Sequence, residues 1–129
     1  MKDQIENLRL KLVDQIKEMN NSVWQDVRIE FQFPPTSDKY YKTIPAFRDE
    51  NGKILVLFLK PNPDFQDALY KLIYGLNKEG DVNQIIFTAK SNEIENGAIN
   101  VLFDKTINDV FENNLPKKMR GKTTGWYKI

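Results

Sequence analysis

The sequence predicts a single α+β domain in which helices pack on a mainly antiparallel five-stranded sheet. Apolar residues recur at spacings of three and four in some segments, as they do on the buried face of a helix. Other segments alternate apolar and polar residues, or form short apolar runs bounded by turn residues, as strands do. Of the 129 residues, 40% are hydrophobic, which is enough for one core, so residues 1–129 are expected to form one domain.

The predicted order of elements is α-β-β-β-α-β-β-α. Helices are expected at 3–20, 63–80 and 107–115, and strands at 24–33, 40–47, 53–60, 83–90 and 98–103. The strand at 24–33 has the clearest pattern, because Val27, Ile29 and Phe31 alternate with polar residues, as on a strand with one buried face. The second helix is bounded by Pro63 at its start and by Gly80 at its end.

Two features predict where the second and third strands lie in the sheet. Pro45 in the second strand lacks a backbone donor, which favours an edge position or a bulge. Ile54 to Leu59 is unbroken apolar sequence after the turn DENG at 49–52. We therefore predict that the third strand is central and covered on both faces.

The topology predicts a candidate binding surface. If the first three strands form a meander and the second helix returns the chain, the fourth strand runs parallel to the first. The loop at 34–39, the start of the second helix and the connection at 91–97, in which Asn96 and Gly97 are expected at positive φ, then lie at one end of the sheet. This acidic, aromatic-flanked end suits a protein partner with a basic surface, such as a nuclease. The candidate contacts are Asp38, Tyr40, Tyr41, Asp64, Glu93 and Glu95.

The composition argues against several kinds of active site. The chain has no histidine and no cysteine, which removes imidazole-dependent triads, thiolate nucleophiles, disulfides and the commonest metal ligands. The pairs Asp64 with Asp67 and Glu93 with Glu95 leave carboxylate-only metal hydrolysis as an alternative, although such pairs are typical of helix starts and solvated turns. GKTTG at 121–125 lacks the upstream glycine of a phosphate-binding loop. We expect no enzymatic activity, no catalytic residue, no metal and no cofactor.

The C-terminal segment 116–129 carries the marked charge asymmetry of the chain. Five basic residues follow Glu112 with no acid among them, although the formal net charge of the whole chain is only +1. Basic residues beside Trp126 and Tyr127 are compatible with single-stranded nucleic acid, through phosphate contacts and stacking. Aromatic residues at a chain end more often pack on the body of a domain. We therefore expect this segment to dock on the domain.

The N-terminal residues predict neither a signal peptide nor a membrane anchor. Charges recur every few residues there, and no apolar core of 7 to 15 residues is present. The rest of the chain has no run approaching the roughly 18 apolar residues of a membrane span. We expect a soluble, cytoplasmic protein without a membrane partner.

Four segments carry a resemblance to a known family. They are SVWQDVRIEFQF at 22–33, DALYKLIYGLNKEG at 67–80, NQIIFTAKSNEIENGAINVLFDK at 83–105 and GWYKI at 125–129. In layout and pattern they resemble the YezG-like immunity proteins, which are bacterial antidotes to polymorphic or contact-dependent toxins. Members of that family often have acidic runs after the closing hairpin, and this chain instead has the basic segment described above.

The resemblance implies a function. It implies a non-enzymatic immunity protein, an antitoxin that binds and neutralises one cognate toxin in the cytoplasm, as in contact-dependent growth inhibition. The toxin is often a nuclease in such systems. The alternative that the residues leave open is a small nucleic-acid-binding module that uses the basic C-terminal segment.

Overall fold

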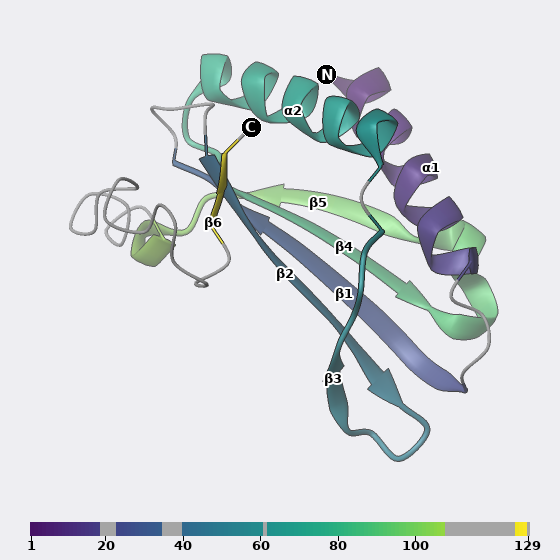
Figure 1. Cartoon of the computed structure of the whole chain (residues 1–129). Helices are drawn as coiled ribbons and strands as arrows, with labels where there is room; N and C mark the ends of the chain where they lie inside the picture. Colours follow the sequence, from purple (N-terminus) through teal and green to yellow (C-terminus); the bar gives the residue numbers. More distant parts are fainter. Residues whose placement is uncertain (19–22, 35–39, 61, 108–125, 129) are drawn as a thin grey trace.

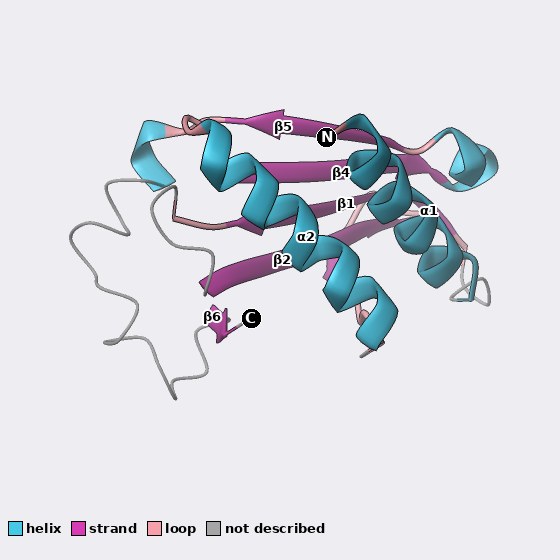
Figure 2. Cartoon of the chain, turned by 90° about the horizontal axis from the view of Figure 1, so that it is seen from above, coloured by secondary structure: helices cyan, strands magenta, loops and turns pink. Residues whose placement is uncertain are grey.

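The structure is a computed structural model that describes residues 1–18, 23–34, 40–60, 62–107 and 126–128 (Figure 1). Two helices cover one face of a sheet (Figure 2). The elements are α1 (Lys2–Glu18), β1 (Trp24–Gln32), β2 (Tyr40–Asp49), β3 (Ile54–Val56), α2 (Pro63–Glu79), β4 (Gln84–Lys90), the 3-10 helix η1 (Ser91–Asn96), β5 (Ala98–Leu102) and β6 (Trp126–Lys128). The predicted α+β class is confirmed.

The sheet is antiparallel throughout. Five strands follow one another in the order β3-β2-β1-β4-β5, and β6 pairs with β2. β1 is the central strand, with Ile29 opposite Pro45 on β2 and opposite Phe87 on β4. The predicted order of elements is confirmed through β5, and helical backbone follows at 105–107. The rest of the predicted final helix, 108–115, lies outside the described residues.

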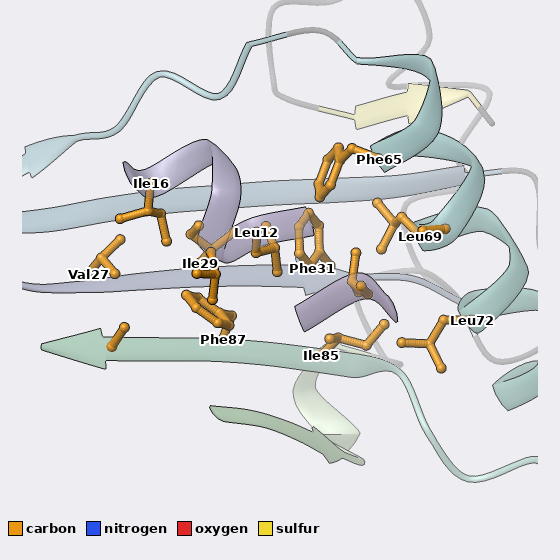
Figure 3. Close-up of a cluster of buried hydrophobic side chains, with 14 of the residues drawn as sticks. Leu12, Ile16, Val27, Ile29, Phe31, Phe65, Leu69, Leu72, Ile85 and Phe87 are labelled. Carbon is orange, nitrogen blue, oxygen red and sulfur yellow. The ribbon is translucent and has the colours of Figure 1, made fainter. Parts of the chain in front are cut away.

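The core lies between the sheet and the two helices. Val27, Ile29 and Phe31 point from β1 toward the helices and are buried, which confirms the alternation predicted for this strand. Figure 3 shows Phe31 between Leu12 of α1 and Leu69 of α2. Burying one such side chain stabilises a fold by about 1.5–3 kcal/mol, so this face of β1 fixes where both helices pack.

Local sequence sets both ends of α2. The Asn62 side chain accepts hydrogen bonds from the backbone N–H groups of Asp64, at 2.9 Å, and Phe65, at 3.3 Å, and Pro63 occupies the first turn. At the other end Gly80 has φ of +73°, a conformation that costs glycine little. The predicted end of the helix at Gly80 is confirmed.

The prediction of a central, doubly covered third strand is wrong. β3 contains only three residues, occupies the edge of the sheet, and leaves the side chains of Ile54 and Val56 exposed. Leu55 and Leu57 face the other way, and Leu57 is buried. Alternate residues of the apolar run face opposite sides of the sheet. Both sets are apolar, although the described residues cover only the side that faces the helices.

The prediction that the fourth strand runs parallel to the first is also wrong. β4 pairs with β1 antiparallel, and Gln32 at the end of β1 lies opposite Gln84 at the start of β4. The cause is the path of α2, which crosses the sheet from the β2 side to the β4 side and does not run back along the strands (Figure 2). The chain therefore enters β4 at the end where β1 finishes.

The connection between β4 and β5 differs from the expected turn. It is the 3-10 helix η1, and neither Asn96 nor Gly97 has a positive φ; φ of Gly97 is −55°. Gly97 is needed here for space, because a Cβ atom on it would lie 2.5 Å from Cζ of the buried Phe87. The glycine permits close approach of the connection to the core.

The described end of the chain lies along the body of the domain. β6 pairs with the start of β2, with Tyr127 opposite Tyr41 and Trp126 opposite Lys42. Residues 116–125 lie outside the described residues, so docking of the whole C-terminal segment stays a prediction.

Candidate protein-binding surface

The structure divides the predicted contact residues between the two ends of the sheet. Lys90, the last residue of β4, lies opposite Asp26 near the start of β1, and η1 follows Lys90 directly. The predicted grouping of Glu93 and Glu95 with the loop at 34–39 is wrong, because β4 runs antiparallel to β1 and therefore ends, with η1 after it, at the other end of the sheet. The turn between β2 and β3, not the connection between β1 and β2, shares an end with η1.

Two of the predicted residues remain close to each other. Tyr41 packs against Phe31, with ring centroids 6.5 Å apart, and Phe65 in the first turn of α2 packs against Phe31 at 6.0 Å. Asp64 precedes Phe65 in that turn and is exposed. Tyr41 itself is buried, so it packs beneath this surface and is not an exposed contact. Asp38 lies outside the described residues, and for Tyr40 only the backbone is described.

Glu95 has a structural partner. Its carboxylate forms an ion pair with Lys17, and its backbone carbonyl accepts a hydrogen bond from Arg9 Nη1 at 2.9 Å. Arg9 is in turn held by Glu6, at 2.8 Å. Glu95 therefore ties α1 to η1, while Glu93 is exposed.

A groove of about 470 Å³ lies between β2, the segment after β3 and the first turn of α2. It forms because β3 ends at Val56 and the chain then leaves β2, after the Leu57 N–H has donated a hydrogen bond to the Pro45 carbonyl at 3.1 Å. Pro45 and Leu57 contribute apolar walls, and Lys60 and Gln66 contribute polar groups. The groove therefore presents a mainly apolar floor next to the start of α2.

The outer face of α2 carries a pair of half-exposed aromatic side chains. Tyr70 is 37% exposed and Tyr74 is 42% exposed, and their ring centroids are 6.2 Å apart. Lys78 Nζ lies 4.3 Å from the centroid of Tyr74, a cation–π contact that holds the second ring in place. Gln66, one turn before Tyr70, lines the groove. The tyrosine pair and the groove therefore adjoin on one helix.

Sequence reasoning missed this tyrosine pair. The pattern that predicts α2 places Phe65, Leu69 and Leu72 on the buried stripe, and Tyr70 and Tyr74 fall outside it at a spacing of four. Two aromatic residues at i and i+4 off the core stripe are neighbours on the solvent side. That spacing is the signal by which the sequence indicates an exposed aromatic surface.

The sheet face opposite the helices carries polar residues that bond to one another. At its centre Glu30 is only 5% exposed, and its carboxylate lies 2.6 Å from Arg28 Nη1. Burial raises the pKa of Glu30, but hydrogen bonds from Gln32, Gln84 and Arg28 outweigh burial and hold the pKa below its usual value of 4.5. The side chain is therefore a charged, satisfied element of the sheet.

We expect the substitution Glu30→Gln to weaken the domain in a pH-dependent way. A lowered folded-state pKa means that the carboxylate stabilises the fold above the unfolded pKa near 4.5, and that this stability is lost as the pH falls through the folded pKa. The difference in free energy of unfolding between wild type and variant should therefore be full at pH 7 and should shrink below pH 4.5. Urea denaturation across this range measures it, with Glu50→Gln in the exposed β2–β3 turn as the control. A difference that stays constant down to the lowest pH contradicts the role of the charge.

No protein-family model matches the chain, and no curated protein shows significant similarity to it. Among the described residues, no group of three or more acidic side chains is arranged to hold a metal ion. The described helices are also too short or too polar to cross a membrane.

Proposed function

We propose that the chain is an immunity protein that binds a cognate bacterial toxin domain and blocks its active site or functional surface. In this role the protein acts in the cytoplasm and is not an enzyme. The layout shared with YezG-like immunity proteins supports the proposal, and nuclease toxins are the class that such a resemblance often implies. The structural observation that carries a binding role is the tyrosine pair of α2.

The tyrosine pair has the properties of an interface anchor. Tyr70 and Tyr74 are not required to fill the core, since both rings lie on the solvent side of α2. Tyrosine offers a large, rigid contact area and is enriched among residues that dominate binding energy. The contact with Lys78 fixes one ring before binding, which lowers the entropic cost of association.

The neighbouring features extend this anchor into a surface. Asp64 adds a negative charge at the start of the same helix, and it is the predicted contact that lies closest to the tyrosine pair along α2. The groove beside Gln66 can receive an apolar side chain of the partner. We therefore place the toxin on α2 and the mouth of the groove. The predicted contacts Glu93 and Glu95 lie at the other end of the sheet and are not part of this surface.

The test uses the protein encoded directly upstream of this gene as the toxin. Its expression in a bacterial host should stop growth, and co-expression of the chain should restore it. The purified pair should bind, and Tyr70→Ala and Tyr74→Ala should each weaken binding by about 2 kcal/mol, or about 30-fold in Kd. Isothermal titration measures the affinity, and thermal denaturation confirms that each variant stays folded.

Val23→Ala provides the control. Val23 is an apolar residue, 72% exposed, that precedes β1 at the end of the sheet where η1 lies, so its truncation should leave the affinity unchanged. If the tyrosine variants bind as tightly as wild type, the proposed surface is wrong. If the upstream protein is neither toxic nor bound by the chain, the proposed function is wrong.

A further inference from the structure

The free edge at β3 and the residues after it carry three of the four most exposed large apolar side chains among the described residues. Ile54 is 70% exposed, Val56 is 76% exposed and Phe58 is 87% exposed. The three residues alternate along the chain, and Val56 and Ile54 lie opposite Ala46 and Arg48 of β2. Ile54 and Val56 therefore lie on the face opposite the helices, and Phe58 continues the row along the edge beyond β3, where it also lines the groove.

The backbone of this row is also directed away from β2. Bonds to β2 come from odd-numbered residues: the Lys53 carbonyl accepts from the Asp49 N–H at 2.9 Å, and the Leu57 N–H donates to Pro45. In an antiparallel ladder the intervening residues direct their N–H and C=O groups to the other side. No strand pairs with that side in the part of the chain that the structure describes. The row thus combines apolar side chains with open backbone donors and acceptors.

We propose that this edge pairs with the β3 edge of a second copy of the chain, antiparallel about a two-fold axis at Val56. Ile54 and Phe58 lie two residues to either side of Val56, so the row is complementary to itself. Pairing sets Val56 against the partner's Val56 and Ile54 against the partner's Phe58, all in hydrogen-bonding positions. The two sheets become one continuous sheet, and six apolar side chains that face water in the single chain cover one another.

The charge that precedes the row favours the same arrangement. Lys53 comes directly before Ile54. Parallel pairing in register would set Lys53 against the partner's Lys53, and like charges directly opposite are destabilising. Antiparallel pairing about Val56 instead sets Lys53 opposite the partner's Leu59, so the two lysines lie at opposite ends of the paired row. Lys60 takes no part, because its Nζ lies 3.4 Å from the carboxylate of Glu18 on α1.

The pairing leaves the tyrosine pair of the proposed toxin surface uncovered. α2 crosses the helix-covered side of the sheet (Figure 2), and Tyr70 and Tyr74 lie on the solvent side of this helix. Val56 and Phe58 also line the groove, so the two surfaces meet only at its mouth. The tyrosine pair of each copy therefore stays exposed in the dimer, and the test of the dimer is separate from the test of the proposed function.

Disulfide cross-linking tests the contact and its register, because the chain has no cysteine of its own. Val56→Cys should form a covalent dimer on mild oxidation, since Cα atoms in a hydrogen-bonded antiparallel pair are about 5.5 Å apart, within the range of a disulfide. Ile54→Cys and Phe58→Cys should not cross-link alone, because each lies about 13 Å from its own copy. A mixture of those two variants should cross-link.

Leu102→Cys is the control. Leu102 ends β5 at the other edge of the sheet, on the same face as the row, and is 45% exposed. Strong cross-linking of Val56→Cys and of the mixture, with little for Leu102→Cys, supports the proposal. Equal cross-linking of Val56→Cys and Leu102→Cys, or none at Val56, overturns it.

Sedimentation of the unmodified chain provides a second measurement. The row is smaller than a standard stable interface, so the mass should rise from 15.1 kDa toward twice that value only as concentration increases. Val56→Lys, which places two ammonium groups at the axis, should remain a monomer, while Leu102→Lys should behave as wild type. A wild-type chain that stays monomeric at millimolar concentration overturns the proposal. The remaining partner for this edge is then a strand from another protein.

Discussion

Replacing Phe31 with alanine should lower the free energy of unfolding by about 3–5 kcal/mol. Phe31 is fully buried on the central strand and packs against Tyr41 of β2 and Phe65 of α2. Truncation leaves a cavity where the strand, its neighbour and the helix meet. Because a domain of this size is stable by only about 5–15 kcal/mol, the variant should be close to unfolding at 37 °C. Urea denaturation at low temperature measures the loss as a shift of the midpoint at constant m-value.

Phe58→Ala is the matched control for this prediction. It makes the same chemical change at a residue that is 87% exposed, where the cost should stay within about 0.5 kcal/mol. The comparison is made at low protein concentration, so that pairing of β3 edges does not contribute. If both variants lose the same stability, the assignment of Phe31 to the core and of Phe58 to the surface is wrong.

The elements that sequence predicted well are those whose pattern is local. The alternation at Val27, Ile29 and Phe31 identifies one buried face without any knowledge of what covers it. The start of α2 at Pro63 and its end at Gly80 follow from backbone chemistry at those residues. Each of these predictions depends on neighbours within a few positions, and each is confirmed.

The elements that sequence predicted wrongly depend on the path of the chain through space. A continuous apolar run from Ile54 to Leu59 is compatible with a strand covered on both faces and with an edge strand whose outer side meets a partner. The direction of β4 depends on whether α2 runs back along the strands or crosses them. The residues of α2 do not determine which path the helix takes, because its buried stripe from Phe65 to Leu76 is compatible with both.

The candidate surface changed for the same reason. Grouping Glu93 and Glu95 with Asp64 required a fourth strand parallel to the first. Because the predicted direction of β4 was wrong, the predicted set of contact residues was wrong as well. The tyrosine pair does not depend on topology. Its exposure follows from the position of Tyr70 and Tyr74 relative to the buried stripe of their own helix, which makes α2 the part of the surface that sequence alone best predicts.

Gly97→Ala should destabilise the domain by about 3 kcal/mol, at the upper end of the usual cost of overpacking. The new Cβ atom would lie 2.5 Å from Cζ and 2.7 Å from Cε2 of Phe87. Phe87 is fully buried opposite Ile29, so its ring has no open space into which it can move. The backbone conformation of Gly97 adds no strain, because its φ of −55° suits alanine; the new Cβ atom would also lie 3.2 Å from the Ile94 carbonyl oxygen. Thermal or urea denaturation of the single variant measures the effect.

A double-mutant cycle with Phe87→Leu separates this steric cause from others. A leucine at 87 removes the atoms that the new Cβ would meet, so Gly97→Ala should cost much less in the Phe87→Leu background, with an interaction energy of 0.5–3 kcal/mol, about the range for residues in contact. Gly80→Ala is the control: nothing lies within 4 Å of a Cβ there, but φ is +73° and ψ is 169°, a conformation that only glycine adopts readily, so the substitution should cost about 1–3 kcal/mol from the backbone alone. That cost should be the same in both backgrounds. Strict additivity of Gly97→Ala and Phe87→Leu would contradict the close approach of η1 to the core.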